Sequence, residues 1–446
     1  MQNRTFDVVI VGGGITGTAL AYTLAKYTDI KSVAILEKYG SLSPLNSNAR
    51  SNSQTLHCGD IETNYTLEKA ISVKRTANML VKYAEQVDKN DFLYKFPKMI
   101  LAVGDDECER LEKRHEEFKE GFPYMELWDA DKIAEVEPKV ALKDGKPRPE
   151  RILASGCTDE YSAVNYGNLS KSFIDSARKT GKDIRVSLSS KVDRIIELED
   201  HYELQTAHGT YVGRFVVVSA GAHSLLLANQ LGHGMNLSTL PMAGSFYFAP
   251  KMLNGKVYTM QNDKLPFAAL HGDPDLTEPD KTRLGPTALV LPKLERYTGG
   301  TYMDFWRSLK LDTKVLRVFW DLMKDGTIRN YIFRNFLFEV PWLNKKLFVK
   351  DARKILPDLT TKDLTYAEGY GGVRPQVIDK TTKELKLGEA SIVPEHDNII
   401  FNMTPSPGAT TCLGNAYRDA KIICERLGVN LKHDELVNDL LDGKDL

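Results

Sequence analysis

The stretch Phe6–Gly17, FDVVIVGGGITG, decides the fold of this chain. Its first half is an almost fully apolar run, which is typical of a parallel strand buried on both faces. The glycines follow at once: Gly12 permits a tight turn, Gly14 lets the backbone approach a pyrophosphate, and Gly17 lets a helix pack closely on the sheet. The pattern therefore predicts a strand, a phosphate-binding turn and a helix whose N-terminus faces the phosphates.

The residues that follow complete a nucleotide-binding unit. Leu20, Leu24 and Tyr27 have helical spacing, and a second apolar strand, Val33–Leu36, ends at Glu37. A carboxylate at this position accepts hydrogen bonds from the ribose hydroxyls of an adenosine and repels a 2′-phosphate. The sequence thus predicts a nucleotide without a 2′-phosphate, which disfavours NADP.

Two later segments bear on the choice between NAD and FAD, because FAD recruits residues far along the chain. The runs Lys191–Ile196 and Tyr202–Thr206 alternate as strands, and Arg214–Ala222 (RFVVVSAGA) is a buried strand that ends in small residues. This set resembles the strand meander and closing turn of glutathione-reductase-type FAD domains. Near the C-terminus, the strand Asn398–Asn402 leads to the helix start Gly408–Thr410, whose backbone N–H groups suit a reduced flavin.

The predicted fold is α/β, with a glutathione-reductase-type Rossmann domain that binds FAD and a second domain. Three discontinuous segments, 1–85, 150–235 and 360–446, are expected to form the FAD-binding domain. The insertions 86–149 and 236–359 are expected to form a mixed α+β domain that faces the substrate and the membrane. The first insertion is charged and helix-like, and the second contains several strand-like runs.

Composition and motif spacing exclude several classes of protein. The chain has 446 residues, more than one compact core usually holds, so two domains are expected. A charged content of 27% with a formal net charge of -1 argues against a nucleic-acid partner. The five cysteines contain no CxxC pair and no cluster has metal-ligand spacing, so we expect neither a disulfide framework nor a metal. The sequence contains no apolar run of about twenty residues, so it predicts no helix that spans a membrane.

Five longer stretches narrow the family. They are Asn52–Tyr65 (NSQTLHCGDIETNY), Lys264–Asp275 (KLPFAALHGDPD), Arg283–Ala288 (RLGPTA), Gly371–Val377 (GGVRPQV) and Phe401–Leu413 (FNMTPSPGATTCL). Together they resemble the malate:quinone oxidoreductase family within the D-amino-acid-oxidase-like flavoprotein superfamily. The resemblance implies that malate is oxidised to oxaloacetate, with FAD as the electron carrier and membrane quinone as the acceptor.

Candidate catalytic residues lie in these stretches. Arg374 has a planar guanidinium that can hold a carboxylate through two N–H groups. His271 follows an apolar strand and precedes a turn, so it is the preferred base, whereas His57 is a competing base or a flavin contact. Malate has a second carboxylate, for which Arg283 is a plausible clamp. The expected neutral hydrogen-bond donors to substrate are Gln54, Thr55 and Tyr65.

The residues expected to contact FAD come from the glycine turn, from the flavin-passing segment and from three later turns. They are Gly12, Gly14, Ile15, Thr16, Gly17, Glu37, Lys38, Asn52, Ser53, Gln54, Ala220, Gly221, Gly372, Gly408, Ala409 and Thr410.

A different part of the sequence bears on the identity of the electron acceptor. No second GxGxxG follows a strand, so the acceptor is oxygen, another redox protein or quinone. Tyr302–Lys350 contains three of the four tryptophans, Trp306, Trp320 and Trp342, interleaved with phenylalanines and basic residues. Such a mixture suits a membrane interface, although a helical subdomain with inward rings fits the residues equally. The resemblance favours a cytoplasmic protein bound peripherally to the inner face of the cell membrane.

Two other interpretations of the chain stay open. An L-2-hydroxyglutarate dehydrogenase would use the same flavin chemistry on a diacid that is one carbon longer. A redox-silent regulatory protein would hold FAD as a structural ligand, and no 2-hydroxy acid would reduce its flavin. Flavin reduction by the two acids therefore distinguishes the three interpretations.

Overall fold

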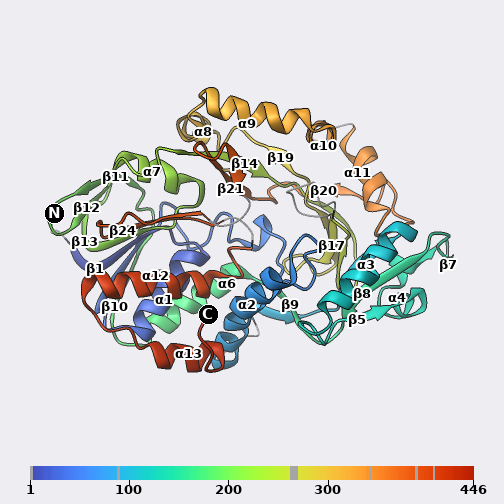
Figure 1. Ribbon diagram of the computed structural model, residues 1–446, viewed down its shortest axis with the longest axis horizontal. Coiled ribbons are helices and arrows are strands. Elements are labelled where there is room, and N and C mark those ends of the chain that lie inside the picture. Colours follow the sequence, from blue (N-terminus) through green and yellow to red (C-terminus); the bar gives the residue numbers. More distant parts are fainter. Residues whose placement is uncertain are drawn as a thin grey trace.

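Two eight-stranded sheets and one four-stranded sheet form the framework of the chain, with helices on their outer faces (Figure 1). The computed structural model describes residues 4–87, 91–261, 270–338, 340, 343–386, 390–404 and 407–446. The fold is mixed α/β, as the alternating apolar strands and helices predicted.

The first sheet contains the strand that opens the chain. Its order is β10-β2-β1-β13-β12-β11, with β24 beside β13 and β23 beside β24. These strands are β1 (Arg4–Val11), β2 (Ser32–Leu36), β10 (Asp183–Ser187), β11 (Val192–Glu197), β12 (Tyr202–Thr206), β13 (Gly209–Val218), β23 (Ala390–Ile392) and β24 (Ile399–Met403). β1 runs parallel to both β2 and β13, and β13 runs parallel to β24. Segments from the start, middle and end of the chain thus share one sheet.

Both faces of β1 are covered, which explains its continuous apolar run. Val8 and Ile10 pack against helices on one face, whereas Val9 and Val11 belong to a second core with the meander strands and α7 (Ser224–Gln230). The helices of the first core are α1 (Ile15–Tyr27), α2 (Leu67–Gln86), α6 (Tyr166–Arg178), α12 (Cys412–Leu427) and α13 (His433–Leu441). Successive strand residues point to opposite faces, so a sheet covered on both sides requires apolar residues at every position.

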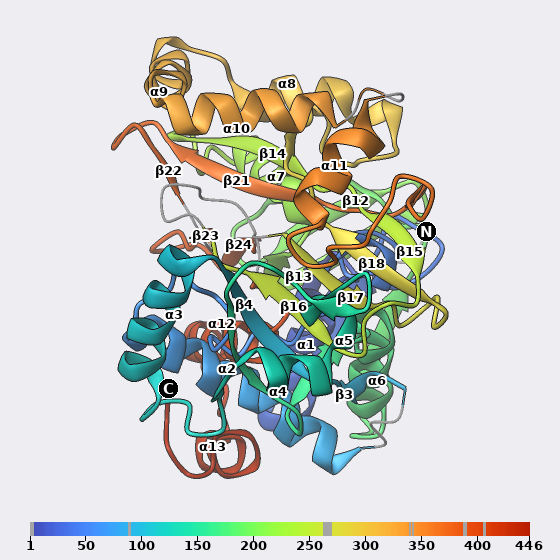
Figure 2. The ribbon, with the colours of Figure 1, turned by 90° about the vertical axis from the view of Figure 1, so that its right-hand side faces the viewer.

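The other large sheets lie in the second half of the molecule (Figure 2). The eight-stranded one has the order β20-β15-β18-β17-β16-β4-β8-β5, and the four-stranded one has the order β19-β14-β21-β22. Their strands are β4 (Lys98–Val103), β5 (Glu126–Trp128), β8 (Ile152–Cys157), β14 (Leu237–Ala243), β15 (Tyr247–Pro250), β16 (Lys256–Thr259), β17 (His271–Pro274), β18 (Lys281–Gly285), β19 (Leu289–Val290), β20 (Thr365–Tyr366), β21 (Val373–Asp379) and β22 (Glu384–Lys386). The other strands and helices of this region are β3 (Leu93–Lys95), β6 (Leu142–Lys143), β7 (Lys146–Pro147), β9 (Tyr161–Val164), α3 (Asp105–Phe118), α4 (Ala130–Val136) and α5 (Pro138–Ala141).

Some strands lie outside the sheet to which their position in the chain had assigned them. β8 pairs with β4, and β21 pairs with β14, although both strands lie within segments expected to form the FAD-binding domain. Pairing between strands distant in sequence decides sheet membership, and the residues of one strand do not show its partner. The chain therefore crosses between the two halves more often than the expected boundaries imply.

Four helices lie between residues 302 and 352; the first three form a layer over the four-stranded sheet (Figure 2), whereas the fourth packs in the core of the neighbouring eight-stranded sheet. They are α8 (Tyr302–Leu309), α9 (Thr313–Lys324), α10 (Gly326–Leu337) and α11 (Asn344–Ala352). Phe305 and Val315 pack inward, whereas Trp320 and Phe333 are 65% and 63% exposed. Both expected arrangements of the rings therefore occur in this layer, and Trp342 lies outside the described residues. None of the described helices is long and apolar enough to cross a membrane.

Candidate active site

A cavity of about 560 Å³ lies at the carboxyl ends of β1, β2 and β13. Val11, Leu36 and Ser219 mark those strand ends on its wall. The opposite wall comes from the second half of the molecule, including β14 and residues 372–376. The carboxyl ends of parallel strands are the usual ligand site in open α/β sheets, so this position agrees with the nucleotide-binding prediction.

The glycine turn has the conformation that its pattern predicts. Gly12 has a φ of 112°, and a Cβ there would lie 2.4 Å from the carbonyl oxygen of Ser219. A Cβ on Gly17 would lie 2.1 Å from the carbonyl oxygen of Gly12, so this glycine serves helix packing beneath the cavity. Helix α1 begins at the cavity wall with no side-chain cap at Gly14 and no acidic residue in its first turn. The Ile15 N–H donates to Oγ of Ser47 at 3.0 Å, and the positive end of the helix still faces the cavity, where it favours an anionic ligand.

Glu37 supports the turn and lines the same cavity. Its Oε2 accepts a hydrogen bond of 2.8 Å from the Gly13 N–H, and its Oε1 accepts one of 2.9 Å from the Tyr39 N–H. Burial raises the pKa of Glu37, and the two N–H donors oppose that effect. Lys38, next along the wall, pairs with Glu295. The carboxylate and the glycine turn therefore form one connected surface.

Most residues expected to contact FAD line the cavity. They are Gly12, Gly14, Ile15, Thr16, Glu37, Lys38, Asn52, Ser53, Ala220, Gly221, Gly372 and Ala409. Gly17, Gln54, Gly408 and Thr410 lie behind the wall. Gln54 donates to the carbonyl of Ala49 and to Asp275, and the Thr410 N–H donates to the carbonyl of Pro407. This last bond removes one of the N–H groups expected to face a flavin.

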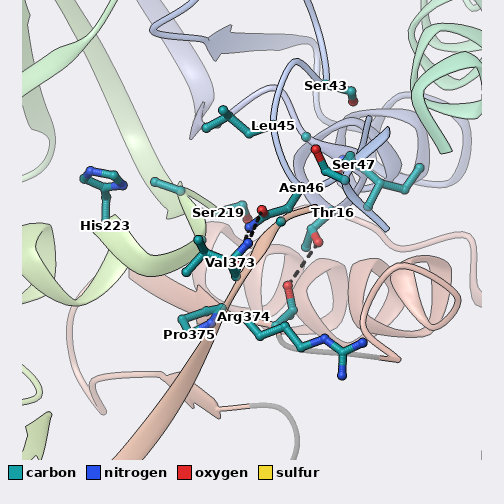
Figure 3. Close-up of a pocket in the computed structure, with 18 of the residues that line it drawn as sticks. Thr16, Ser43, Leu45, Asn46, Ser47, Ser219, His223, Val373, Arg374 and Pro375 are labelled. Atoms are coloured by element: carbon teal, nitrogen blue, oxygen red, sulfur yellow. Dashed lines mark hydrogen bonds between the residues drawn. The ribbon is translucent and has the colours of Figure 1, made fainter. Parts of the chain in front are cut away.

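The loop 43–47 also lines the cavity and was not expected there. Asn46 holds it against β21, because its side chain donates to the carbonyl of Val373 at 2.8 Å and accepts from the Val373 N–H at 3.0 Å (Figure 3). A Cβ on Gly372 would lie 2.8 Å from the same Asn46 side chain. A cluster of serines and asparagines after Glu37 is the only signal in the sequence, and such clusters mark most loops.

Arg374 projects from β21 into the cavity wall and away from His223 (Figure 3). Among the described residues, no hydrogen bond or ion pair engages its guanidinium. Burial lowers the pKa of Arg374, and the nearby tyrosines Tyr258, Tyr331 and Tyr65 act in the opposite direction. Arg374 is half-buried, and the partial desolvation of a cation without an acidic partner is costly, so this position favours an anionic ligand.

His57 lines the cavity on the flavin-passing segment. Its Nδ1 lies 2.5 Å from Oε1 of Glu62, and its Nε2 lies 3.3 Å from Oγ of Ser53. The carboxylate can only accept, so it selects the tautomer that carries the proton on Nδ1. Nε2 then carries a lone pair, as a general base requires, and in this structure the Ser53 hydroxyl is its partner.

The other expected catalytic residues lie behind the wall. His271 is 2% exposed, stacks on Tyr258 with ring centres 4.3 Å apart, and has its Nε2 3.6 Å from Asp273. Arg283 is fully buried and pairs with Asp275 at 3.2 Å, which neutralises its charge inside the protein. His271 and Arg283 therefore do not reach the cavity. The expected roles, a base for His271 and a second carboxylate-binding group for Arg283, both require that access.

The neutral donors expected for the substrate differ in placement. Thr55 lines the cavity, but its hydroxyl donates to the carbonyl of Ser53. Tyr65 is half-buried outside the wall, with Nζ of Lys69 4.2 Å from its ring centre, and burial raises its pKa. Gln54 is committed to internal hydrogen bonds.

Among the described residues, no group of three His, Cys, Asp or Glu side chains could hold a metal ion.

Solved structures of two oxidases have the same fold as this chain. L-α-glycerophosphate oxidase from Mycoplasma pneumoniae, with FAD bound, gives a TM-score of 0.65 at 18% identity over 95% of each chain. Glycine oxidase from Geobacillus kaustophilus gives a TM-score of 0.62 at 18% identity, over 100% of this chain and 96% of that one. The chain therefore has the fold of these two oxidases, with a glycine turn and a carboxylate on the wall of its cavity.

Sequence comparisons then give the family. The model of the family malate:quinone oxidoreductase matches residues 4–416. The chain is 54% identical to a probable malate:quinone oxidoreductase of Campylobacter jejuni, over 99% of this chain and 100% of the relative. It is 46% identical to the malate:quinone oxidoreductase of Helicobacter pylori, over 98% of both. The chain belongs to the malate:quinone oxidoreductase family, which confirms the resemblance seen in its motifs.

Proposed function

We propose that this chain catalyses the FAD-dependent oxidation of (S)-malate to oxaloacetate and passes the electrons to membrane quinone. Membership of the family supports both substrates. The observation that carries the substrate class is Arg374, a half-buried arginine that lines the same cavity as the glycine turn and has no ionic partner among the described residues. A carboxylate of malate would supply that partner.

The cavity residues fit FAD in their chemistry. The start of α1 at Gly14 would face the pyrophosphate, Glu37 would hold the ribose, and the loop 46–53 with Gly372 would flank the flavin ring. In this proposal the first sheet and its helices are the glutathione-reductase-type Rossmann domain. When bound, FAD supplies a two-electron acceptor for the hydrogen at C2 of malate and the donor for quinone.

In the proposed oxidation of malate, one side chain would bind the substrate and another would accept its proton. Arg374 binds one carboxylate through paired N–H donors and thereby fixes the orientation of C2. His57 accepts the proton of the 2-hydroxyl at Nε2, and Glu62 stabilises the resulting imidazolium across the 2.5 Å contact. Loss of that proton and of a hydride from C2 leaves the ketone of oxaloacetate.

The substrate assignment predicts a preference between two diacids. (S)-malate should reduce the bound flavin anaerobically, and L-2-hydroxyglutarate should do so at least about tenfold more slowly, because one extra methylene displaces C2 once Arg374 holds the distal carboxylate. Rapid-mixing absorbance measurements of flavin bleaching give both rates. A faster reaction with L-2-hydroxyglutarate would reassign the substrate, and no reaction with either acid would support the redox-silent alternative.

We further propose that the exposed side of α8 to α10 contacts the inner face of the cell membrane. Trp306, Trp320, Phe333 and Phe336 are 43%, 65%, 63% and 59% exposed along these helices. Basic side chains lie between them, and those of Arg307, Arg317 and Lys324 are 70%, 65% and 63% exposed. Exposed rings enter the headgroup region while cations meet anionic lipid, so the layer fits a peripheral contact that brings quinone within reach.

A triple substitution tests the membrane contact. Trp320, Phe333 and Phe336 replaced by serine should weaken binding to anionic vesicles by about tenfold or more, because three rings no longer leave water. Quinone reduction should fall while malate oxidation with a water-soluble dye persists. Vesicle sedimentation in low and high salt measures binding, and salt should weaken the contribution of the lysines and arginines.

The matched control replaces three exposed leucines that lie outside this layer. Leu127, Leu188 and Leu198 are 42%, 39% and 41% exposed, and their change to serine should leave vesicle binding and quinone reduction unaltered. Equal losses in the two triple variants would contradict the assignment. Equal losses of dye and quinone activity in the aromatic variant would do so as well.

A further inference from the structure

A buried ion pair lies directly behind the wall that carries His57. Lys256 of β16 is 1% exposed and Asp273 of β17 is fully buried, and Nζ lies 3.1 Å from Oδ1. Burial lowers the pKa of Lys256 although Asp273 opposes the shift. Removing two charges from water is costly, so the other contacts of this pair are relevant to its role.

Lys256 also contacts two residues of the cavity wall. Its Nζ lies 3.1 Å from Oγ1 of Thr55 and 3.3 Å from the carbonyl oxygen of Ser53. Thr55 and Ser53 both line the cavity, whereas Lys256 and Asp273 do not. Among the residues that the structure describes, Thr55 and Ser53 are thus the wall residues to which Lys256 donates hydrogen bonds.

Hydrogen-bond directions in this cluster are set by the lysine. An ammonium group can only donate, so Thr55 accepts from Lys256. The Thr55 hydroxyl donates its own proton to the carbonyl of Ser53 at 3.1 Å. Tyr258, whose hydroxyl lies 2.6 Å from the same Oγ1, must then donate to Thr55. The carbonyl of Ser53 thus receives two donors and is fixed in place.

Ser53 connects this cluster to the proposed base. Its Oγ lies 3.3 Å from Nε2 of His57, the nitrogen proposed to accept the proton. With Nδ1 held by Glu62, Ser53 is the protein group that defines the other side of the imidazole. A shift of the Ser53 backbone would therefore move the partner of Nε2, and small displacements of a base cost rate steeply.

We propose that Lys256, anchored by Asp273, is a positioning residue for the oxidation of the 2-hydroxy acid. It fixes Ser53 and Thr55 on the cavity wall, and through Ser53 it orients His57 and sets the charge that the imidazole senses. This inference rests on the proposed function, because it assumes that His57 is the base.

Lys256 and Asp273 balance each other's charge, so replacing either one leaves one uncompensated charge in the cluster. The charged and titratable groups that face the cluster are Tyr258 of β16, His271 of β17, Arg283 of β18 with Asp275, Lys98 of β4 with Asp60, Glu62 and Tyr65 of the segment that carries His57, Tyr331 of α10 and Arg374 of β21. Lys98 is the register neighbour of Lys256, and β4, β16 and β17 lie side by side in Figure 2.

Opposite substitutions should shift the pH profile in opposite directions. Lys256→Met leaves the negative charge of Asp273, which stabilises the imidazolium, so the acidic limb of malate-driven flavin reduction should move about one pH unit higher. Asp273→Asn leaves the positive charge of Lys256 and should move that limb lower. Each variant should also reduce flavin about tenfold more slowly at the plateau, with malate binding little changed. Lys256→Arg should recover most of the loss.

A second pair of variants keeps the proposal testable if the charge variants do not fold. Thr55→Val removes the acceptor for Lys256 and Tyr258 at nearly constant volume and should slow flavin reduction, whereas Thr55→Ser should recover most of that rate. NMR of 15N-histidine-labelled protein, with His57 assigned by its glutamine variant, should show its titration midpoint moving with the pH limb. This readout is independent of turnover.

The outcomes separate this inference from the proposed function. Unchanged pH limbs and titration midpoints in Lys256→Met and Asp273→Asn, with FAD retained, would overturn the positioning role. So would equal rates in Thr55→Val and Thr55→Ser. If His57→Gln itself reduces flavin at the normal rate, the base assignment has failed first, and the proposed mechanism is at fault.

Discussion

Replacing Arg374 with lysine should lower kcat/KM for malate by on the order of a hundredfold while FAD remains bound. Lysine keeps the charge in the cavity wall but lacks the planar pair of N–H donors that a carboxylate accepts. Because Arg374 has no ionic partner among the described residues, the substitution breaks no internal ion pair known from the structure. The loss should therefore appear in substrate handling. Stopped-flow reduction and the dissociation constant of succinate, which lacks the reactive hydroxyl, measure rate and binding separately.

A buried arginine serves as the control for this experiment. Arg148 is 8% exposed, donates to the carbonyls of Val140 and Lys354, and does not line the cavity. Arg148→Lys should lower the melting temperature without changing the dissociation constant of succinate. If Arg374→Lys binds succinate and oxidises malate normally, Arg374 does not belong to the substrate site.

The local parts of the fold could be predicted because their causes are local. The apolar run of β1 and the glycines after it report burial on both faces and close backbone contact, and Glu37 follows at the end of β2. These elements form one side of the cavity, so most of the expected FAD contacts lie on its wall. No comparable signal marks the loop 43–47, because an irregular segment has no periodicity.

The non-local parts could not be predicted in the same way. His271 and His57 were both candidate bases in the sequence, and only the folded chain shows that His271 is stacked on Tyr258 and does not line the cavity. Arg283 resembled a free cation in sequence, yet β17 and β18 pair antiparallel and Asp275 neutralises it. The difference between a substrate clamp and an internal ion pair lies in a contact across strands, which a single sequence does not record.

His57→Gln and His271→Gln should have unequal effects on flavin reduction by malate. A general base contributes about 10²–10⁴-fold, so loss of His57 should slow reduction by at least about a hundredfold. Its effect on malate binding should be small, because proton transfer occurs in the transition state. His271→Gln should cost far less, since the ring is stacked on Tyr258 behind the wall.

The pH dependence of the flavin-reduction rate identifies the base. A base must be neutral to accept a proton, so reduction by the normal enzyme should slow as the pH falls and His57 becomes protonated. In His57→Gln this acidic limb should disappear, leaving a low rate that changes little with pH, whereas His271→Gln should keep the limb. Glutamine occupies nearly the volume of histidine, so FAD content and melting temperature should stay close to those of the unmodified protein. A limb that persists in His57→Gln and vanishes in His271→Gln would exchange the two assignments, and would require the Tyr258 ring to move aside when malate binds.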